Sequence, residues 1–302
     1  FSLRSTGPVW EGDNSGEDTE LVIGTGASWI GNNIGGNIKV EGDIDGLWQG
    51  DNAGTVTVDG ITWNGDNLTN ATAIVGSGVW DGNNFGTATF NGGNWNGDNA
   101  ETGKVTVNAT GWDGNNAGAG SVELKADWSG NNTANGSVTL NGGTWSGNNT
   151  GESATVSGKN GKWTGDNSGT ITVNGITWEG NNLEGVTLSS GTWSGTNSGT
   201  ATIEGGKWTN DNAGTVIFNG GSWNGNNAAN GEVTIEADGW SGNNAGTVTL
   251  NKGTWDGTNS GIVDMFNGTW GGNNSDIGIV TLNGGTWNGG NEGAATIKGG
   301  IW

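Results

Sequence analysis

The sequence predicts an all-β protein, a single parallel β-solenoid of about 18 coils. Three observations predict this fold. Of the 18 intervals between the 19 tryptophans, nine are 15 residues long, and small insertions lengthen the others. An Asn stands four residues after every Trp except the last, which ends the chain. Apolar residues alternate with Thr before most tryptophans.

One clean 15-residue copy, in the segment GTVTVDGITWNGDN (54–67), indicates the local structure of the repeat. Val56 and Val58 flank Thr57, an alternation typical of a short strand with one buried face. Near Asp59-Gly60 the chain turns into a second short strand that contains Trp63, and the Gly-Asp-Asn corner closes the coil. Such a unit cannot bury its own apolar face, but stacked copies can.

Parallel stacking places each residue over its counterpart in the next coil, about 4.8 Å away. We therefore expect an internal Trp stack and an Asn ladder in which each side-chain amide donates to the next. The residues expected in these ladders include Trp63, Trp95, Trp178, Trp208, Trp255, Asn67, Asn99, Asn182, Asn212 and Asn259. The nearly fixed Gly two residues after Trp, replaced once by Asn210, predicts a left-handed backbone there.

The repeat covers residues 10–302, and residues 1–9, FSLRSTGPV, form an N-terminal arm outside it. Terminal coils of a solenoid expose unpaired strand edges. We expect copies to stack head to tail as a homopolymer, with end-to-end contacts from Phe1, Pro8, Trp10, Ile301 and Trp302. The alternative is that the chain is an excerpt of a longer protein.

Composition excludes several functions. Without Cys or His, the chain has no disulfide, thiolate or imidazole chemistry. The net charge of −21 disfavours nucleic acid and anionic membranes, and no apolar run is long enough for membrane insertion. The acidic residues are scattered and corner insertions are short, so we expect no enzyme, no cofactor and no metal site.

Two surface features suggest ligands. Asp precedes the fixed Asn in six coils, at Asp13, Asp51, Asp66, Asp98, Asp166 and Asp211, so a weak contact with Ca²⁺ is an alternative to solvated corners. Thr pairs such as Thr200/Thr202 leave ice binding open, although Ile217 and Asp264 interrupt the Thr column. The tryptophans are expected in the core rather than as sugar-stacking platforms, so polysaccharide contact is expected to be weak.

The segment WSGNNTANGSVTLNGGTW (128–145) resembles the Gly/Asn/Thr-rich repeats of bacterial autotransporter passengers and filamentous-haemagglutinin-like surface proteins. That resemblance implies a secreted β-helical protein at the cell surface. The sequence therefore predicts a non-catalytic extracellular structural protein, a fibre subunit that stacks end to end. The alternatives are the stalk of a cell-surface adhesin and an ice-binding protein that uses its Thr ladder.

Overall fold

The computed structural model describes residues 2–5, 9–43, 45–109 and 111–302, and it confirms the predicted fold. The chain is a parallel β-solenoid of about 17 coils with a repeat of about 17 residues. The repeat averages more than the 15-residue unit because many corners hold extra residues, and paired asparagines lie 15 to 19 residues apart. Within the described ranges, no helix is long and apolar enough to cross a membrane.

The chain divides into two compact units. Unit 1 comprises Phe1–Thr155 and Lys159–Gly161, and unit 2 comprises Val156–Gly158 and Lys162–Trp302. Strand β17 (Ala154–Gly158) contributes residues to both. The same coil design is repeated within each unit.

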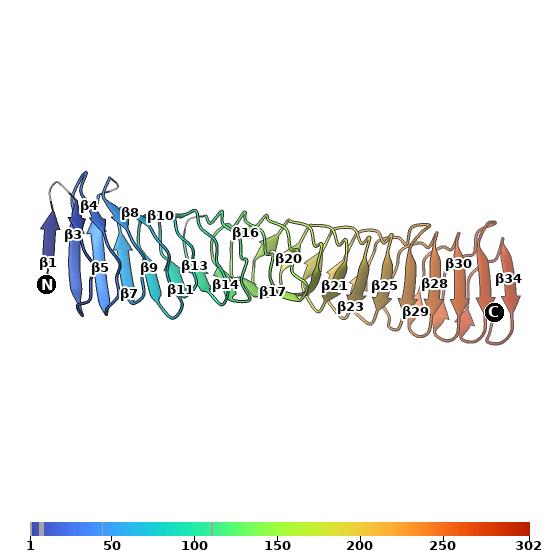
Figure 1. Cartoon of the computed structure of the whole chain (residues 1–302). Helices are drawn as coiled ribbons and strands as arrows, with labels where there is room; N and C mark the ends of the chain where they lie inside the picture. The colour runs from blue at the N-terminus through green and yellow to red at the C-terminus, as the bar shows by residue number, and fades with distance from the viewer. Residues whose placement is uncertain (1, 6–8, 44, 110) are drawn as a thin grey trace. The chain divides into compact units, whose positions relative to one another are not determined.

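In unit 1, one long strand per coil pairs in parallel with the long strand of the next coil, as the blue and green ribbons show (Figure 1). These long strands are β1 (Ser2–Ser5), β3 (Thr19–Ile23), β5 (Asn37–Gly42), β7 (Thr55–Asp59), β9 (Thr72–Val75), β11 (Thr87–Phe90), β13 (Lys104–Val107), β14 (Ser121–Leu124) and β15 (Ser137–Leu140). The short strands that contain Trp are β2 (Trp10–Glu11), β4 (Ser28–Ile30), β6 (Leu47–Gln49), β8 (Ile61–Asn64), β10 (Gly78–Trp80), β12 (Asn94–Trp95) and β16 (Thr144–Trp145).

Residues 2–5 depart from the expected boundary between an arm and the repeat. They form β1, which pairs in parallel with β3 and aligns Leu3 with Leu21. The sheet thus extends into the segment that the sequence places outside the repeat. That segment has no Trp and no Asn corner, but a parallel strand needs only backbone groups to join a sheet edge.

Unit 2 has the same arrangement of long and short strands. Its long strands are β19 (Thr170–Asn174), β21 (Gly185–Leu188), β23 (Thr200–Ile203), β25 (Thr215–Phe218), β27 (Glu232–Ile235), β28 (Thr247–Leu250), β30 (Ile262–Met265), β32 (Ile279–Leu282) and β34 (Ala294–Ile297). Its short strands are β18 (Lys162–Trp163), β20 (Thr177–Trp178), β22 (Thr192–Trp193), β24 (Lys207–Trp208), β26 (Ser222–Trp223), β29 (Thr254–Trp255), β31 (Thr269–Trp270) and β33 (Thr286–Trp287).

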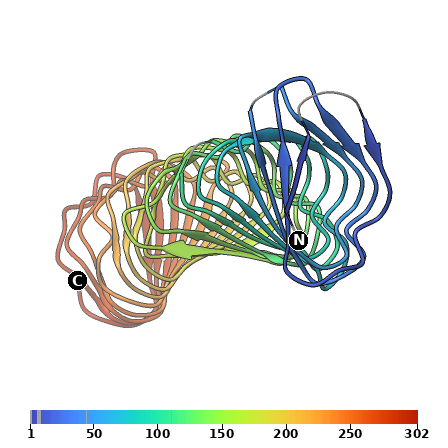
Figure 2. The same ribbon diagram turned by 90° about the vertical axis from the view of Figure 1, so that its left-hand side faces the viewer.

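The core of each unit is a set of columns, each made of residues at one position of successive coils. Figure 2 shows the coils of a unit lying one behind another. In β7, Val56 and Val58 are buried while Thr57 reaches the surface, as the alternation predicts. The Gly that precedes the Trp strand makes the bend into it. Gly143, for example, has φ of +62°, a conformation that glycine adopts at low cost.

Candidate functional site

The Asn column is a continuous hydrogen-bonded ladder within each unit. In unit 1, Nδ2 of each Asn from Asn14 to Asn132 donates to Oδ1 of the Asn on the next coil at 2.7–2.9 Å. In unit 2, the bonds from Asn167 to Asn291 measure 2.7–2.8 Å. The predicted ladder residues Asn67, Asn99, Asn182, Asn212 and Asn259 all lie in these two columns, fully buried.

The ladder satisfies both the acceptor and the donor of each buried side-chain amide, because each Asn inside a column bonds to the Asn of the preceding coil and to the Asn of the next coil. Asn197 donates from Nδ2 to Asn212 Oδ1 at 2.7 Å and lies within hydrogen-bond range of the carbonyls of Gly199 (3.1 Å) and Thr215 (3.2 Å). Its Oδ1 accepts the amide of Asn182 at 2.7 Å. Within each unit the described ladder bonds all point toward the next coil, so the amide dipoles polarise one another.

The Trp column is a continuous face-to-face stack within each unit. Adjacent ring centroids lie 4.5–5.3 Å apart in unit 1, from Trp10 to Trp145. They lie 4.5–5.0 Å apart in unit 2, from Trp163 to Trp302. The predicted residues Trp63, Trp95, Trp178, Trp208 and Trp255 lie inside these stacks and are 0–2 % exposed.

The Gly two residues after Trp is required for a different reason from the one that the sequence suggested. Its carbonyl accepts the indole N–H of the Trp on the next coil, as Gly165 does from Trp178 at 2.9 Å. This contact brings the coils so close that a Cβ on Gly180 would stand 1.8 Å from the carbonyl oxygen of Gly165. Of these glycines, only Gly12, Gly31 and Gly50 have a positive φ. The expectation of a left-handed backbone was therefore wrong for most coils.

A second, outer ladder runs through the residue three after Trp, and the sequence analysis missed it. Oδ1 of this Asp or Asn accepts the backbone N–H of its counterpart on the next coil at 2.7–3.1 Å. The signal in the sequence was the restriction of this position to Asp, Asn and Thr in all but one coil. The single exception to Gly also fits here. Thr196 has a hydroxyl in place of the amide or carboxylate, and its Oγ1 donates to Asn181 Oδ1 at 2.7 Å. The N–H of Asp211 donates instead to Asn210 Oδ1 at 2.9 Å.

The six corner carboxylates belong to this outer ladder. Asp13, Asp51, Asp66, Asp98, Asp166 and Asp211 each use Oδ1 to accept a backbone N–H. Among the described residues, no three Asp or Glu side chains are grouped so that they could hold a metal ion. The corner carboxylates thus have a structural role, and the weak contact with Ca²⁺ stays a prediction.

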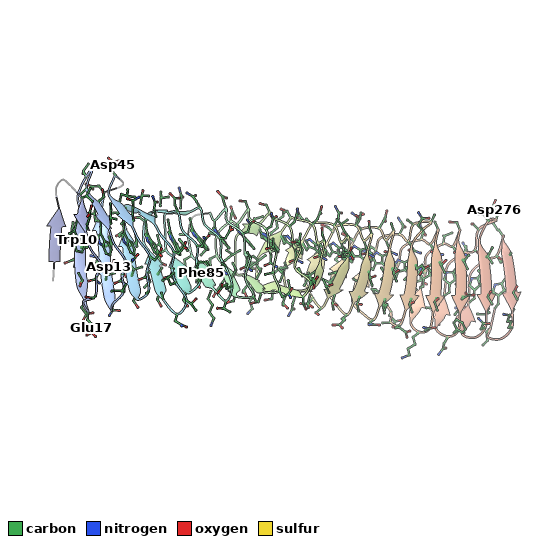
Figure 3. All side chains as sticks on the ribbon, in the orientation of Figure 1. Trp10, Asp13, Glu17, Asp45, Phe85 and Asp276 are labelled. Carbon is green, nitrogen blue, oxygen red and sulfur yellow. The ribbon has the colours of Figure 1, made fainter. Side chains whose placement is uncertain are left out.

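A notch on unit 1 lies between two corner insertions. It has a volume of about 300 Å³ and is lined by Thr69, Asn70, Phe85, Gly86, Thr87, Thr102 and Lys104. Each wall is a hydrogen-bonded β-turn, closed by Ala71 N–H to Leu68 O at 3.0 Å and by Gly103 N–H to Ala100 O at 2.9 Å. Phe85 is half-buried on the shorter corner between them (Figure 3). The arrangement offers one aromatic face surrounded by hydroxyl, amide and ammonium groups.

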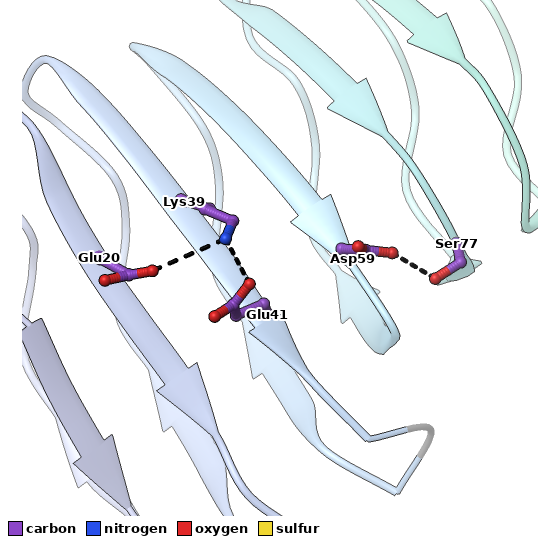
Figure 4. Close-up of polar contacts among 5 residues, drawn as sticks. All are labelled: Glu20, Lys39, Glu41, Asp59 and Ser77. Carbon is purple, nitrogen blue, oxygen red and sulfur yellow. Dashed lines mark hydrogen bonds and ion pairs between the residues drawn. The ribbon is translucent and has the colours of Figure 1, made fainter.

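An acidic hollow of about 480 Å³ lies where β3, β5 and β7 of unit 1 end, and its lining includes Glu41, Asp43 and Asp59. Close by, Lys39 pairs with Glu41 and lies 3.6 Å from Glu20, while Ser77 donates to Asp59 (Figure 4). The hydrogen bond to Glu41 and the charges of Glu41 and Glu20 raise the pKa of Lys39. The Lys39–Glu20 and Ser77–Asp59 pairs link neighbouring coils at the surface, whereas Lys39 and Glu41 both lie on β5.

The last coil of unit 2 leaves its inward columns uncovered. Ile297 and Trp302 are 48 % and 58 % exposed, whereas Leu282 and Trp287, one coil earlier, are 0 % and 1 % exposed. Trp302 still stacks on Trp287 at 5.0 Å, and Ile301 is also exposed. Of the other expected end contacts, Trp10 is half-buried against Trp29. Phe1 and Pro8 lie outside the described residues.

Comparison with protein families, curated proteins and solved structures gave no match for this chain. Of the resemblance to autotransporter passengers and haemagglutinin-like proteins, the structure confirms the parallel solenoid with its Asn ladder.

Proposed function

We propose that the protein is a non-catalytic structural protein of the cell surface or extracellular space, a fibre subunit whose copies associate head to tail. The observation that carries this proposal is the uncovered last coil. Strand β34 pairs on one side with β32, and Ile297, Ile301 and Trp302 present apolar surface beside its free edge. Sheet edges and exposed apolar patches of this kind favour association.

The direction of the ladders limits how copies could meet. Within each unit the described strand pairings are parallel, and the described Asn side chains of the ladder donate toward the next coil, so only a head-to-tail contact would continue the pattern. Such a contact would place β1 of one copy against β34 of another, and Trp10 against Trp302. A contact of this type does not close on itself and generates a filament.

The outer ladder supports a structural rather than a catalytic role for the six corner aspartates, because their oxygens accept hydrogen bonds from backbone N–H groups. The surface location is supported by the resemblance of the repeat to autotransporter passengers and haemagglutinin-like proteins.

Negative-stain electron microscopy of the purified chain tests the proposal. We expect filaments from the parent chain, and separate particles from Ile297→Lys, which places a charge on the uncovered coil. The matched control is Ile277→Lys, because Ile277 is 71 % exposed on a corner away from the end columns. Separate particles of the parent chain at high concentration would contradict the fibre proposal. They would leave the adhesin stalk, in which further coils of a longer chain cover the same edge.

Ice binding is a second candidate, favoured by the Thr pairs of unit 2. Thr200 and Thr202 on β23 are in register with Thr215 and Ile217 on β25, and Thr247 and Thr249 form another pair on β28. Ile217 interrupts the column, so the regular Thr surface is short. Measurable thermal hysteresis, lost in Thr202→Leu, would support this function, and its absence in the parent chain would exclude it.

A weak polysaccharide contact would be best placed in the notch around Phe85. Saturation-transfer NMR with a methyl pyranoside tests this contact. We expect a signal that Phe85→Ala removes. Leu183→Phe is the matched control: it adds a ring at the same corner position on a coil without flanking insertions, and it should add no signal.

A further inference from the structure

The Trp column of unit 2 contains ten indoles in unbroken contact, from Trp163 to Trp302. We propose that this column conducts positive charge: an indole that loses an electron recovers it from its neighbour, and the vacancy moves along the stack. The partners of this activity are a one-electron oxidant at one point of the column and a one-electron donor at another. The property belongs to the single chain and does not depend on filament formation.

The geometry favours electron exchange between neighbouring rings. Centroids in unit 2 lie 4.5–5.0 Å apart, and the ring planes are inclined by only 3–14°. Stacked π-systems at this separation are in van der Waals contact, so their orbitals overlap. The tightest contact, between Trp208 and Trp223, measures 4.5 Å. Every step transfers an electron between two indoles, so the side chains themselves introduce no difference in reduction potential between the donor and the acceptor.

The chain offers few other places for the charge to be trapped. It contains no Tyr, Cys or His and one Met, so Trp is by far the most abundant readily oxidised side chain. The net charge of −21 also favours a cation within the protein. From Trp163 to Trp287 the indoles are 0–2 % exposed, which keeps water from reacting with them.

The indole proton is held in place during the transfer. In unit 2, each Nε1–H from Trp178 to Trp287 donates to a backbone carbonyl on the preceding coil at 2.8–3.0 Å. An oxidised indole is a stronger acid, but an amide carbonyl is a very weak base, so the proton stays on nitrogen and the hydrogen bond stabilises the cation. The step is therefore Trp287•⁺ plus Trp270 giving Trp287 plus Trp270•⁺, with one electron moved and no proton lost.

The absence of Cys and Tyr makes the test specific. In the variant Asn288→Cys, the new thiol at this exposed position beside the buried Trp287 carries a ruthenium polypyridyl photosensitiser. After a flash, a soluble cobalt(III) ammine takes one electron from the excited ruthenium(II), and the resulting ruthenium(III) takes one from Trp287. Thr177→Tyr is the far trap beside Trp178, seven stacking contacts away. There the tyrosine gives an electron to the oxidised indole and a proton to water. Asp256→Tyr is the near trap.

We expect a transient tyrosyl radical in both trap variants. Trp208→Phe, which keeps a ring but removes the oxidisable indole, lies between the two traps. It should lower the far-trap yield by at least about tenfold, since about 1.4 kcal/mol of added barrier has that effect. The near-trap yield in the same variant should be unchanged, which controls for folding and labelling. A far-trap yield that survives Trp208→Phe, or a near-trap radical without a far-trap radical, would overturn the proposal.

Discussion

Replacing one asparagine of the buried ladder tests how much the ladder stabilises the fold. Asn197→Ala removes the bond accepted from Asn182 and the bond donated to Asn212, both 2.7 Å. The neighbours keep other partners, because Asn182 Nδ2 still meets carbonyls at 3.1–3.2 Å and Asn212 Oδ1 still accepts Gly214 N–H at 3.1 Å. Two lost bonds and a small cavity cost about 3 kcal/mol.

Hydrogen exchange measures this loss where it occurs. In a solenoid each coil contacts only its neighbours, so the effect should be concentrated in the coils beside residue 197. About 3 kcal/mol corresponds to a loss of protection of roughly 100-fold. The matched control is Asn219→Ala, the same change at an exposed position, with an expected effect of about 0.5 kcal/mol or less. Equal protection in the two variants would refute the view that the ladder stabilises the fold.

Asn197→Asp adds a dependence on pH. Burial raises the pKa of the introduced carboxyl above its unfolded value of about 3.9. The charged form is penalised in the folded state, so the penalty is largest at neutral pH and falls as the pH approaches the unfolded pKa. Once protonated, the carboxyl has an O–H that can donate to Asn212. The stability of Asn197→Asp should therefore approach that of the non-titrating Asn197→Ala, or exceed it, as pH falls.

Substitutions at three further positions address contacts between coils and at the surface. Gly180→Ala should cost about 3 kcal/mol or more in denaturant unfolding because its Cβ meets backbone 1.8 Å away, whereas Gly111→Ala, with its nearest atom at 3.7 Å, should cost little. A similar loss in both would contradict the close-approach explanation. Asp211→Asn should leave stability unchanged, whereas Asp211→Ala should cost about 1 kcal/mol because it loses the oxygen of the outer ladder. Equal melting temperatures of the two variants would argue against that ladder. The pKa of Lys39 is raised, first by its hydrogen bond with Glu41. Its small contribution to folding stability is therefore present at neutral pH and is lost only as the pH rises through the folded pKa. The melting-temperature difference between Lys39→Gln and the parent should thus stay constant from about pH 6 to pH 9, and a change within that range would contradict this assignment.

The columns of the solenoid could be predicted from the sequence because parallel stacking converts a repeated position into a repeated contact. Trp63 and Trp80, 17 residues apart, stack at 4.5 Å, and Asn67 bonds to Asn84 at 2.9 Å. The two extra residues lie in the corner after Asn67 and leave both contacts intact. Period and residue type therefore determined the fold class and the contents of the core.

The tertiary structure decided what the residues between the columns do. The Gly two residues after Trp recurs in the sequence, but only the structure shows its reason, which is the close approach of a carbonyl of the preceding coil. The outer ladder depends on where Oδ1 of residues such as Asp66 lies relative to the next backbone N–H. Asp and Asn both supply this oxygen, so they make the same hydrogen bond, whereas the sequence alone suggested solvated, charged corners. Strand β1 joins the sheet through its backbone, which carries no side-chain pattern. In each case the deciding interaction links two coils through main-chain atoms, which residue types alone do not specify.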